Sequence, residues 1–170
     1  MSKSIILSHF HKKRAWMASH VESAQFPTLE SKEGLRLYKA AEAEPVEIDV
    51  ATVEKRGSLI VYEVDCHPLM VRYAKTLSLK WPEHERETLI AFLSQLSLTD
   101  LPLPEGMQVQ LFVGMQQGAP VATGMLVTSE ETTGKVIGIY DVFGLSAEAK
   151  NSIRHHLYAL ASEGTVVGEL

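Results

Sequence analysis

Two consecutive hairpin patterns in the second half of the chain restrict its fold more than any other feature. Between residues 108 and 115, apolar residues at the odd positions alternate with other residues, the period-two pattern of a strand with two different faces. Residues 116–120 have the composition of a turn, and residues 121–128 are again rich in strand-forming residues. Residues 129–134 are polar and end in Gly134, which predicts a second hairpin. A third strand is expected at residues 135–143.

A helix is predicted after the third strand, starting beyond Gly144, Leu145 and Ser146. Its apolar face is formed by Ala149, Ile153, His156, Leu157 and Leu160. Gly164 is placed to cap the end of this helix, because glycine adopts the left-handed conformation of a C-terminal cap without steric cost. The final strand is expected at residues 165–167.

The first half of the chain predicts a mixture of helices and strands. Residues 4–22 have the narrow apolar stripe of a helix, and residues 29–34 read as a polar connection. Residues 35–41 and 46–53 are predicted to be strands, as are residues 58–64. Two helices are then expected, because Pro68 and Pro82 each stand at a favourable first helical position.

The predicted hairpin carries a family resemblance. The run from Leu111 to Val127, with Gly118 in its turn and Val121-Ala122 opening its second strand, resembles the β2–β3 hairpin of GNAT acyltransferases, the acetyl-CoA-dependent superfamily. Residues 136–143, which include Ile139-Tyr140-Asp141-Val142, resemble the fourth strand of that fold. The helix ending at Gly164 and the strand at residues 165–167 resemble its third helix and fifth strand. The resemblance implies a mixed α+β fold with a mostly antiparallel central sheet flanked by helices.

The sequence departs from the family pattern at the cofactor loop. GNAT enzymes normally open their third helix with Arg/Gln-x-x-Gly-x-Gly/Ala, whose glycines let backbone N–H groups approach the pyrophosphate of coenzyme A. The matching residues here run from Ala147 to Ser152, and no glycine stands between Gly144 and Gly164. Glu148 also adds a negative charge where the family binds a phosphate.

The resemblance further implies a fourth helix and two more strands after the fifth strand. The residues up to Leu170 do not include them. The predicted fold therefore lacks the usual C-terminal elements. We expect the strands at residues 35–41 and 46–53 to cover the sheet edge that those elements would cover, since an exposed apolar edge favours aggregation. A partner subunit would serve the same purpose, so a homodimer is the alternative. In domain terms, residues 1–57 form an N-terminal extension on a GNAT-like domain of residues 58–170.

If acyl transfer occurs, the family resemblance implies where the site lies. Acetyl-CoA or another acyl-CoA would be the cofactor, and its pantetheine arm would follow the end of the fourth strand at Val142, Phe143 and Gly144. Asn151 and Ser152 near the helix start would contact an anion. Asp141 is the candidate general base for an amine acceptor, because burial raises the pKa of a carboxyl group toward neutrality. Tyr140 is the second catalytic candidate, although neighbouring strand residues face opposite ways unless a bulge intervenes.

Composition excludes several other classes of function. The net charge of −5 gives no support for a nucleic-acid partner, since a phosphate backbone selects for a basic face. The single cysteine, Cys66, excludes an intrachain disulfide and a multi-cysteine metal site, and no metal site is predicted. No apolar run approaches the roughly 18–20 residues of a membrane-spanning helix. The N-terminus is unlike a signal peptide, so a cytoplasmic location is expected.

Three hypotheses remain open at this point. The chain is an acyl-CoA-dependent N-acyltransferase with an atypical cofactor loop, or a GNAT-like binding or dimerisation module without transferase activity. Alternatively, it is an unrelated α+β domain whose hairpin matches the family by chance. A small-molecule amine is the acceptor that the first hypothesis implies, and the sequence does not specify which one.

Overall fold

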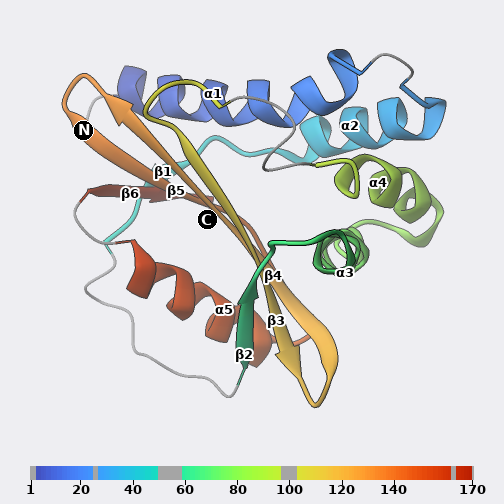
Figure 1. Cartoon of the computed structure of the whole chain (residues 1–170). Coiled ribbons are helices and arrows are strands. Elements are labelled where there is room, and N and C mark those ends of the chain that lie inside the picture. Colours follow the sequence, from blue (N-terminus) through green and yellow to red (C-terminus); the bar gives the residue numbers. More distant parts are fainter. Residues whose placement is uncertain (1–2, 25–26, 50–58, 97–102, 162–163, 170) are drawn as a thin grey trace.

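A six-stranded open sheet forms the centre of the structure, a computed structural model that describes residues 3–24, 27–49, 59–96, 103–161 and 164–169 (Figure 1). The fold is mixed α+β. In spatial order the strands run β1-β6-β5-β4-β3-β2. Their bounds are Val46–Glu47 for β1, Ile60–Glu63 for β2, Gln108–Gln116 for β3, Ala119–Glu131 for β4, Gly134–Gly144 for β5 and Thr165–Gly168 for β6.

The three predicted sequential strands are confirmed as β3, β4 and β5, which pair antiparallel. The β3–β4 turn places Gln117 at φ 52° and Gly118 at φ 78°. Two consecutive residues with positive φ match the twist of the flanking strands, so this short turn fixes the register of the hairpin. β2 adds to the outer edge of β3, also antiparallel, whereas β6 pairs parallel with β5.

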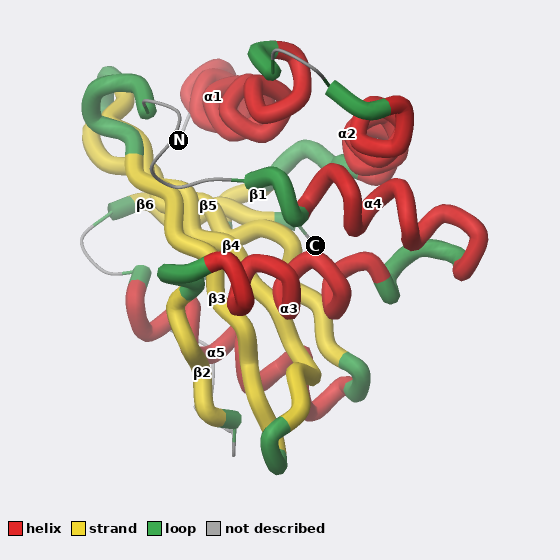
Figure 2. The backbone as a smooth tube through the Cα atoms, turned by 45° about the vertical axis from the view of Figure 1, so that its right-hand side comes forward, coloured by secondary structure: helices red, strands yellow, loops and turns green. Residues whose placement is uncertain are grey.

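Helices cover both faces of the sheet. Figure 2 shows α3 and α4 in front of the strands and α5 behind them. The helices are α1 Lys3–Glu22, α2 Leu29–Ala41, α3 His67–Ser78, α4 Arg86–Leu93 and α5 Ala147–Leu160, with a 3-10 turn at Glu83–Glu85. The predicted first helix, both proline-initiated helices and the helix after the third strand are therefore confirmed. The strand alternation serves both layers, because Leu111 and Val113 pack with α1–α4 while Phe112 packs with α5.

Helix α2 corrects the prediction of a polar connection followed by a strand at residues 35–41. The Thr28 hydroxyl oxygen accepts a hydrogen bond from the Ser31 backbone N–H at 3.0 Å and so caps the helix. Ser31, Leu35 and Tyr38 are buried at helical spacing. Gly34 allows close packing, because a Cβ there would overlap the Thr88 carbonyl of α4. Burial against α4, a tertiary effect, selects the helix here.

Strand β1 is shorter than the predicted strand at residues 46–53. Val46 pairs with Gly168 and Glu47 with Val167 of β6, and the Ile48 N–H donates to the Val166 carbonyl at 2.8 Å. Residues 50–53, like the turn predicted at residues 55–57, lie outside the described residues. The expectation that the N-terminal segment covers the sheet edge is thus confirmed at Val46–Glu47 and wrong for residues 35–41.

The end of α5 also differs from the prediction. The helix ends at Leu160, and the backbone N–H of Ala161 donates to the carbonyls of Leu157 and Tyr158. Ala161 is therefore the capping residue, and the prediction that Gly164 caps the helix is wrong. Gly164 instead lies close to β5, where a Cβ would stand 2.9 Å from the Lys135 carbonyl oxygen. Its small size serves packing beside the sheet.

Lys13 of α1 is fully buried between helix and sheet. Its Nζ lies 4.7 Å from the ring centroids of both Tyr38 and Tyr140, and 3.7 Å from Oε2 of Glu42. Arg14 also lies near that carboxylate, at 3.4 Å. A buried cation must be compensated by charge or by aromatic faces, and Lys13 has both. It therefore links α1, α2 and β5 in a single contact.

His9, one turn before Lys13, is buried against the hairpin that joins β4 and β5. The Ser129 hydroxyl donates to Glu131 at 2.7 Å, so the Nδ1–H of His9 donates to the Ser129 oxygen, 2.8 Å away. The buried Nε2 has no hydrogen-bond partner among the described residues and lies against Gly138, where a Cβ would overlap it. Burial lowers the pKa of His9 to about 4, so the imidazole is neutral at pH 7.

We expect His9 to make the fold sensitive to mild acid. A pKa below the unfolded value of 6.5 means that the stabilisation is complete above pH 6.5 and is lost as the pH falls toward 4. The loss is about 3 kcal/mol, because each pKa unit corresponds to about 1.4 kcal/mol. Urea unfolding between pH 7.5 and pH 4 measures it. His9→Gln should flatten this dependence, whereas His84→Gln, at an exposed histidine, is the matched control. An unchanged pH profile in His9→Gln would contradict the expectation.

Candidate functional site

Strand β5 contains a β-bulge at Asp141. Thr123 of β4 pairs with Phe143 and Met125 pairs with Tyr140, so Gly124 alone faces both Asp141 and Val142. Asp141 has φ 53°, the left-handed conformation that lets an extra residue enter one strand. The Thr123 hydroxyl donates to the Asp141 carbonyl at 2.9 Å and holds the bulge in place. The bulge changes which side chains of β5 face the helices.

The bulge overturns the expectation that Tyr140 and Asp141 face opposite sides of the sheet. The Tyr140 ring stacks on His9 and Phe10 of α1, with centroid distances of 5.9 and 6.3 Å. Asp141 accepts a hydrogen bond on Oδ2 from the hydroxyl of Tyr38 in α2, at 2.7 Å. Both side chains therefore lie in the layer of α1 and α2. A residue in the left-handed conformation breaks strict alternation, and the sequence gives no sign of it.

Strand β5 extends beyond the end of β6. The parallel pairing joins Val136–Ile139 to Thr165–Gly168, yet β5 continues to Gly144. Within the described residues, the last five residues of β5 thus present their β6-facing backbone groups without a strand partner. Unpaired N–H and C=O groups of a strand are ready to bind an extended ligand.

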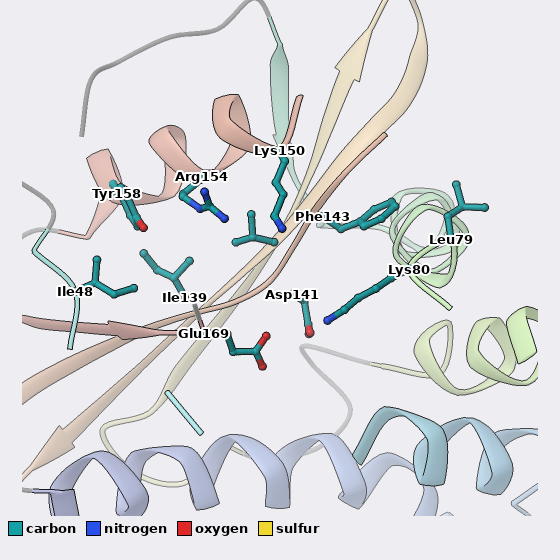
Figure 3. Close-up of a pocket in the computed structure, with 11 residues that line it drawn as sticks. Ile48, Leu79, Lys80, Ile139, Asp141, Phe143, Lys150, Arg154, Tyr158 and Glu169 are labelled. Carbon is teal, nitrogen blue, oxygen red and sulfur yellow. The ribbon is translucent and has the colours of Figure 1, made fainter. Parts of the chain in front are cut away.

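A pocket of about 420 Å³ lies beside this unpaired end of β5. Figure 3 shows side chains entering it from α5 on one side and from β5, the end of α3 and the C-terminal segment on the other. Its charged residues are the cations Lys80, Lys150 and Arg154 and the carboxylates Asp141 and Glu169. The rest of the lining is apolar or aromatic: Ile48, Leu79, Ile139, Val142, Phe143 and Tyr158.

Two carboxylates give the pocket an acidic side. Burial raises the pKa of Glu169, and the negative charge of Asp141 raises it further. Asp141 is 4% exposed, and its partner Tyr38 keeps its proton because burial and the Asp141 charge raise the tyrosine pKa well above its ordinary value. Tyr38 therefore acts as a fixed hydrogen-bond donor. Glu169 is the group poised to exchange a proton closer to neutral pH.

The pocket includes some of the predicted site residues and not others. Asp141, Val142 and Phe143 line it. Tyr140 is fully buried in the core, and burial raises the pKa of its hydroxyl, so it donates a proton to no substrate in this arrangement. Gly144 is needed for packing, because a Cβ there would overlap the backbone nitrogen of Lys150.

The predicted anion contacts Asn151 and Ser152 do not reach the pocket. The Asn151 side-chain oxygen accepts from Arg154 at 3.3 Å on the exposed face of α5. Ser152 lines a separate cavity of about 20 Å³, together with Ser146 and Glu148. The Ser146 hydroxyl oxygen accepts from the Ala149 N–H at 3.1 Å, which caps the helix internally. The start of α5 is therefore too closed to hold a pyrophosphate.

Glu169, Lys80, Arg154 and Tyr158 are functional candidates that sequence reasoning missed. A signal existed for α5, since Lys150, Arg154 and Tyr158 recur every four residues and so share one helix face. No comparable pattern marks Glu169, which follows the last strand, or Lys80, which follows α3. The fold brings these two beside Asp141 (Figure 3).

Comparison of the sequence with protein-family models and with curated proteins gives no match. Among the residues that the structure describes, no helix combines the length and apolarity needed to cross a membrane.

Proposed function

We propose that this chain is an acyl-CoA-dependent N-acyltransferase of the GNAT type with an altered cofactor loop. The observation that carries the proposal is the unpaired end of β5 beside a pocket of about 420 Å³. An extended pantetheine arm carries amide groups that match the exposed N–H and C=O groups of a strand edge. The pairing of β5 with β6 ends at Ile139, just before the bulge at Asp141.

The arrangement of strands supports the same proposal. An antiparallel meander runs from β2 through β5, a pair of helices separates β2 from β3, and a crossover through α5 leads to parallel β6. This is the order that the family resemblance implies for its first five strands. The departure lies at the other edge of the sheet, where β1 from the N-terminal segment pairs with β6.

The residues present fit the pantetheine arm of a coenzyme A thioester along β5. They do not fit its pyrophosphate at the start of α5, where the family normally binds it. The closed start of α5 and Glu148 leave no cradle there. Lys150 and Arg154, one turn apart on the pocket side of α5, are the cations available to phosphate groups instead. The cofactor would supply an acyl group activated as a thioester.

The chain's own residues account for the proton movements of amide formation. Glu169, whose pKa is raised by burial and by Asp141, removes a proton from the acceptor ammonium and makes its nitrogen nucleophilic. Asp141, which accepts the hydrogen bond from Tyr38, lines the same pocket as Glu169. The Tyr158 hydroxyl lines the same pocket and is placed to supply the proton that the leaving sulfur gains. As the C–N bond forms and the C–S bond breaks, the amine nitrogen would lose a second proton, which would restore the Tyr158 hydroxyl. Glu169 would release the first proton to water, so one proton leaves for each ammonium that is acylated and the reaction balances.

Cofactor binding is tested by thermal unfolding with coenzyme A, acetyl-CoA and longer acyl-CoAs. At 100 times its dissociation constant, a ligand adds about 2.7 kcal/mol to the free energy of unfolding. For a chain of this size that corresponds to a rise in melting temperature of about 5–11 °C. Lys150→Glu should abolish the rise, because it reverses a charge in the pocket. Lys32→Glu changes an exposed lysine of α2 and is the matched control.

The closed start of α5 favours a second candidate, a module of the same fold that binds a ligand in the pocket without acyl transfer. The two are separated by the same measurement. No rise in melting temperature at millimolar coenzyme A or acyl-CoA would end the transferase proposal and leave the binding module. A rise that Lys150→Glu removes would support the transferase.

A further inference from the structure

The pocket beside β5 is charged oppositely on its two sides. Lys150 and Arg154 enter from α5, whereas Asp141 and Glu169 lie across the pocket on β5 and just after β6 (Figure 3). In Figure 3 the amino end of Lys80 points toward Asp141. Lys80 therefore lies near Asp141, and its charge, like that of Lys13, also acts on Glu169. The pKa of Glu169 is still raised, because burial and the Asp141 charge outweigh these two cations. This division calls for a ligand with a negative and a positive group of its own.

Arg154 is suited to the negative group. Its guanidinium is planar and can donate two parallel hydrogen bonds to a carboxylate. The side chain is half-buried, and Asn151, one turn earlier on α5, accepts a hydrogen bond from NH1 at 3.3 Å and steadies it. Lys150 lies closer to the start of α5, nearer the end of β5 that would bind the cofactor. Arg154, one turn further along the helix, is therefore the cation that remains for the acceptor.

Glu169 is suited to the positive group. It is half-buried, and its negative charge lies near that of Asp141, an arrangement that an ammonium group would stabilise. Tyr38 already donates to Oδ2 of Asp141. The pocket is also lined by the apolar residues Ile139, Leu79 and Phe143, which suit a hydrocarbon side chain.

We propose that the acceptor is an α-amino acid or a close analogue, whose carboxylate binds Arg154 while its amine faces Glu169. This inference rests on the proposed acyl transfer and narrows its substrate. It excludes simple alkylamines as preferred acceptors, because they have no carboxylate to accept hydrogen bonds from the Arg154 guanidinium.

Matched pairs of acceptors test the proposal on the full chain. Phenylalanine is compared with phenethylamine, and leucine with 3-methylbutylamine, so that only the carboxylate differs. The rate of free thiol release from acetyl-CoA gives kcat/KM for each acceptor. We expect each amino acid to exceed its amine by about 10–100-fold, the range of one charge-assisted hydrogen bond. Binding of each amino acid without cofactor is measured in parallel by calorimetry.

The variant Arg154→Ala should remove most of this preference by raising KM for the amino acids toward that of the amines. Arg154→Lys should restore only part of it, since an ammonium lacks the planar fork. Arg36→Ala, an exposed arginine of α2, is the control and should keep the full preference. The melting temperature of each variant shows whether it folds. If Arg154→Ala does not fold, the preference of Arg154→Lys for amino acids over amines tests the proposal.

The outcomes separate this inference from the proposed function. Acyl transfer to amines and amino acids at equal rates, or a preference that survives Arg154→Ala, overturns the amino-acid proposal and leaves the transferase. Amino-acid binding that depends on Arg154, without any thiol release, supports the zwitterion site and overturns the transferase. Absence of both amino-acid binding and carboxylate preference overturns the inference outright.

Discussion

Glu169→Gln is expected to lower kcat/KM for acyl transfer by about 10²–10⁴-fold, the usual contribution of a positioned general base. In the wild type the rate should fall as the pH drops through the Glu169 pKa, because the protonated carboxyl cannot take a proton from the amine. That pKa is raised above its ordinary value, so this acid limb should lie above the range of an exposed glutamate. The limb should disappear in the variant. Thiol release measured from pH 5 to pH 9 gives both results.

A loss of folding cannot imitate this result. For a carboxyl group whose pKa is raised in the folded protein, the contribution to stability is present at low pH and is lost as the pH rises. At neutral pH the Glu169 charge therefore costs stability, and Glu169→Gln should melt at the same temperature as the wild type or higher. Glu44→Gln, on an exposed residue, is the control for activity. Full activity in Glu169→Gln would refute the assignment of the base.

Lys13→Ala is expected to lower the free energy of unfolding by about 3–5 kcal/mol, because it removes one partner of a buried ion pair and leaves Glu42 short of compensating charge. The variant also loses the contacts of the lysine stem with two aromatic rings. Urea unfolding at pH 7 measures the change. Lys13→Met retains most of the packing, so the difference between the two variants isolates the packing contribution.

Lys39→Ala is the matched control for the buried lysine. Lys39 forms an ion pair with Glu22 at 3.4 Å, but both side chains are exposed. Its loss should cost about 1 kcal/mol or less, as for other surface pairs. Equal effects of Lys13→Ala and Lys39→Ala would show that the buried cation contributes no more than a surface one.

The sequence predicts the elements whose periodicity is set by local burial. The hairpins of β3–β5 and the apolar face of α5 were readable because every second or every third to fourth residue is apolar. Helix α2 could not be predicted in this way, because its buried residues are only Ser31, Gly34, Leu35 and Tyr38. Close packing on α4 decides its structure. A tertiary contact of this kind leaves almost no trace in a short window.

The candidate site could be predicted only in part, for a similar reason. Asp141, Val142 and Phe143 follow from the position of β5 in the chain order. The bulge that puts Asp141 on the same side as Tyr140 depends on backbone geometry opposite Gly124, and aspartate itself gives no unique signal for it. Glu169 and Lys80 come from segments that the sheet brings together, so their proximity is a product of the fold.

The pairing of β1 with β6 has a consequence for biosynthesis. Val46 pairs with Gly168 across the sheet, so β1 finds its partner only after β6 has been synthesised. Helix α1 packs on β4 and β5, so it too is synthesised long before these partners. Contacts so far apart in the chain slow folding. Until then, the apolar face of α1 around Phe10 and Trp16 is expected to need protection by chaperones.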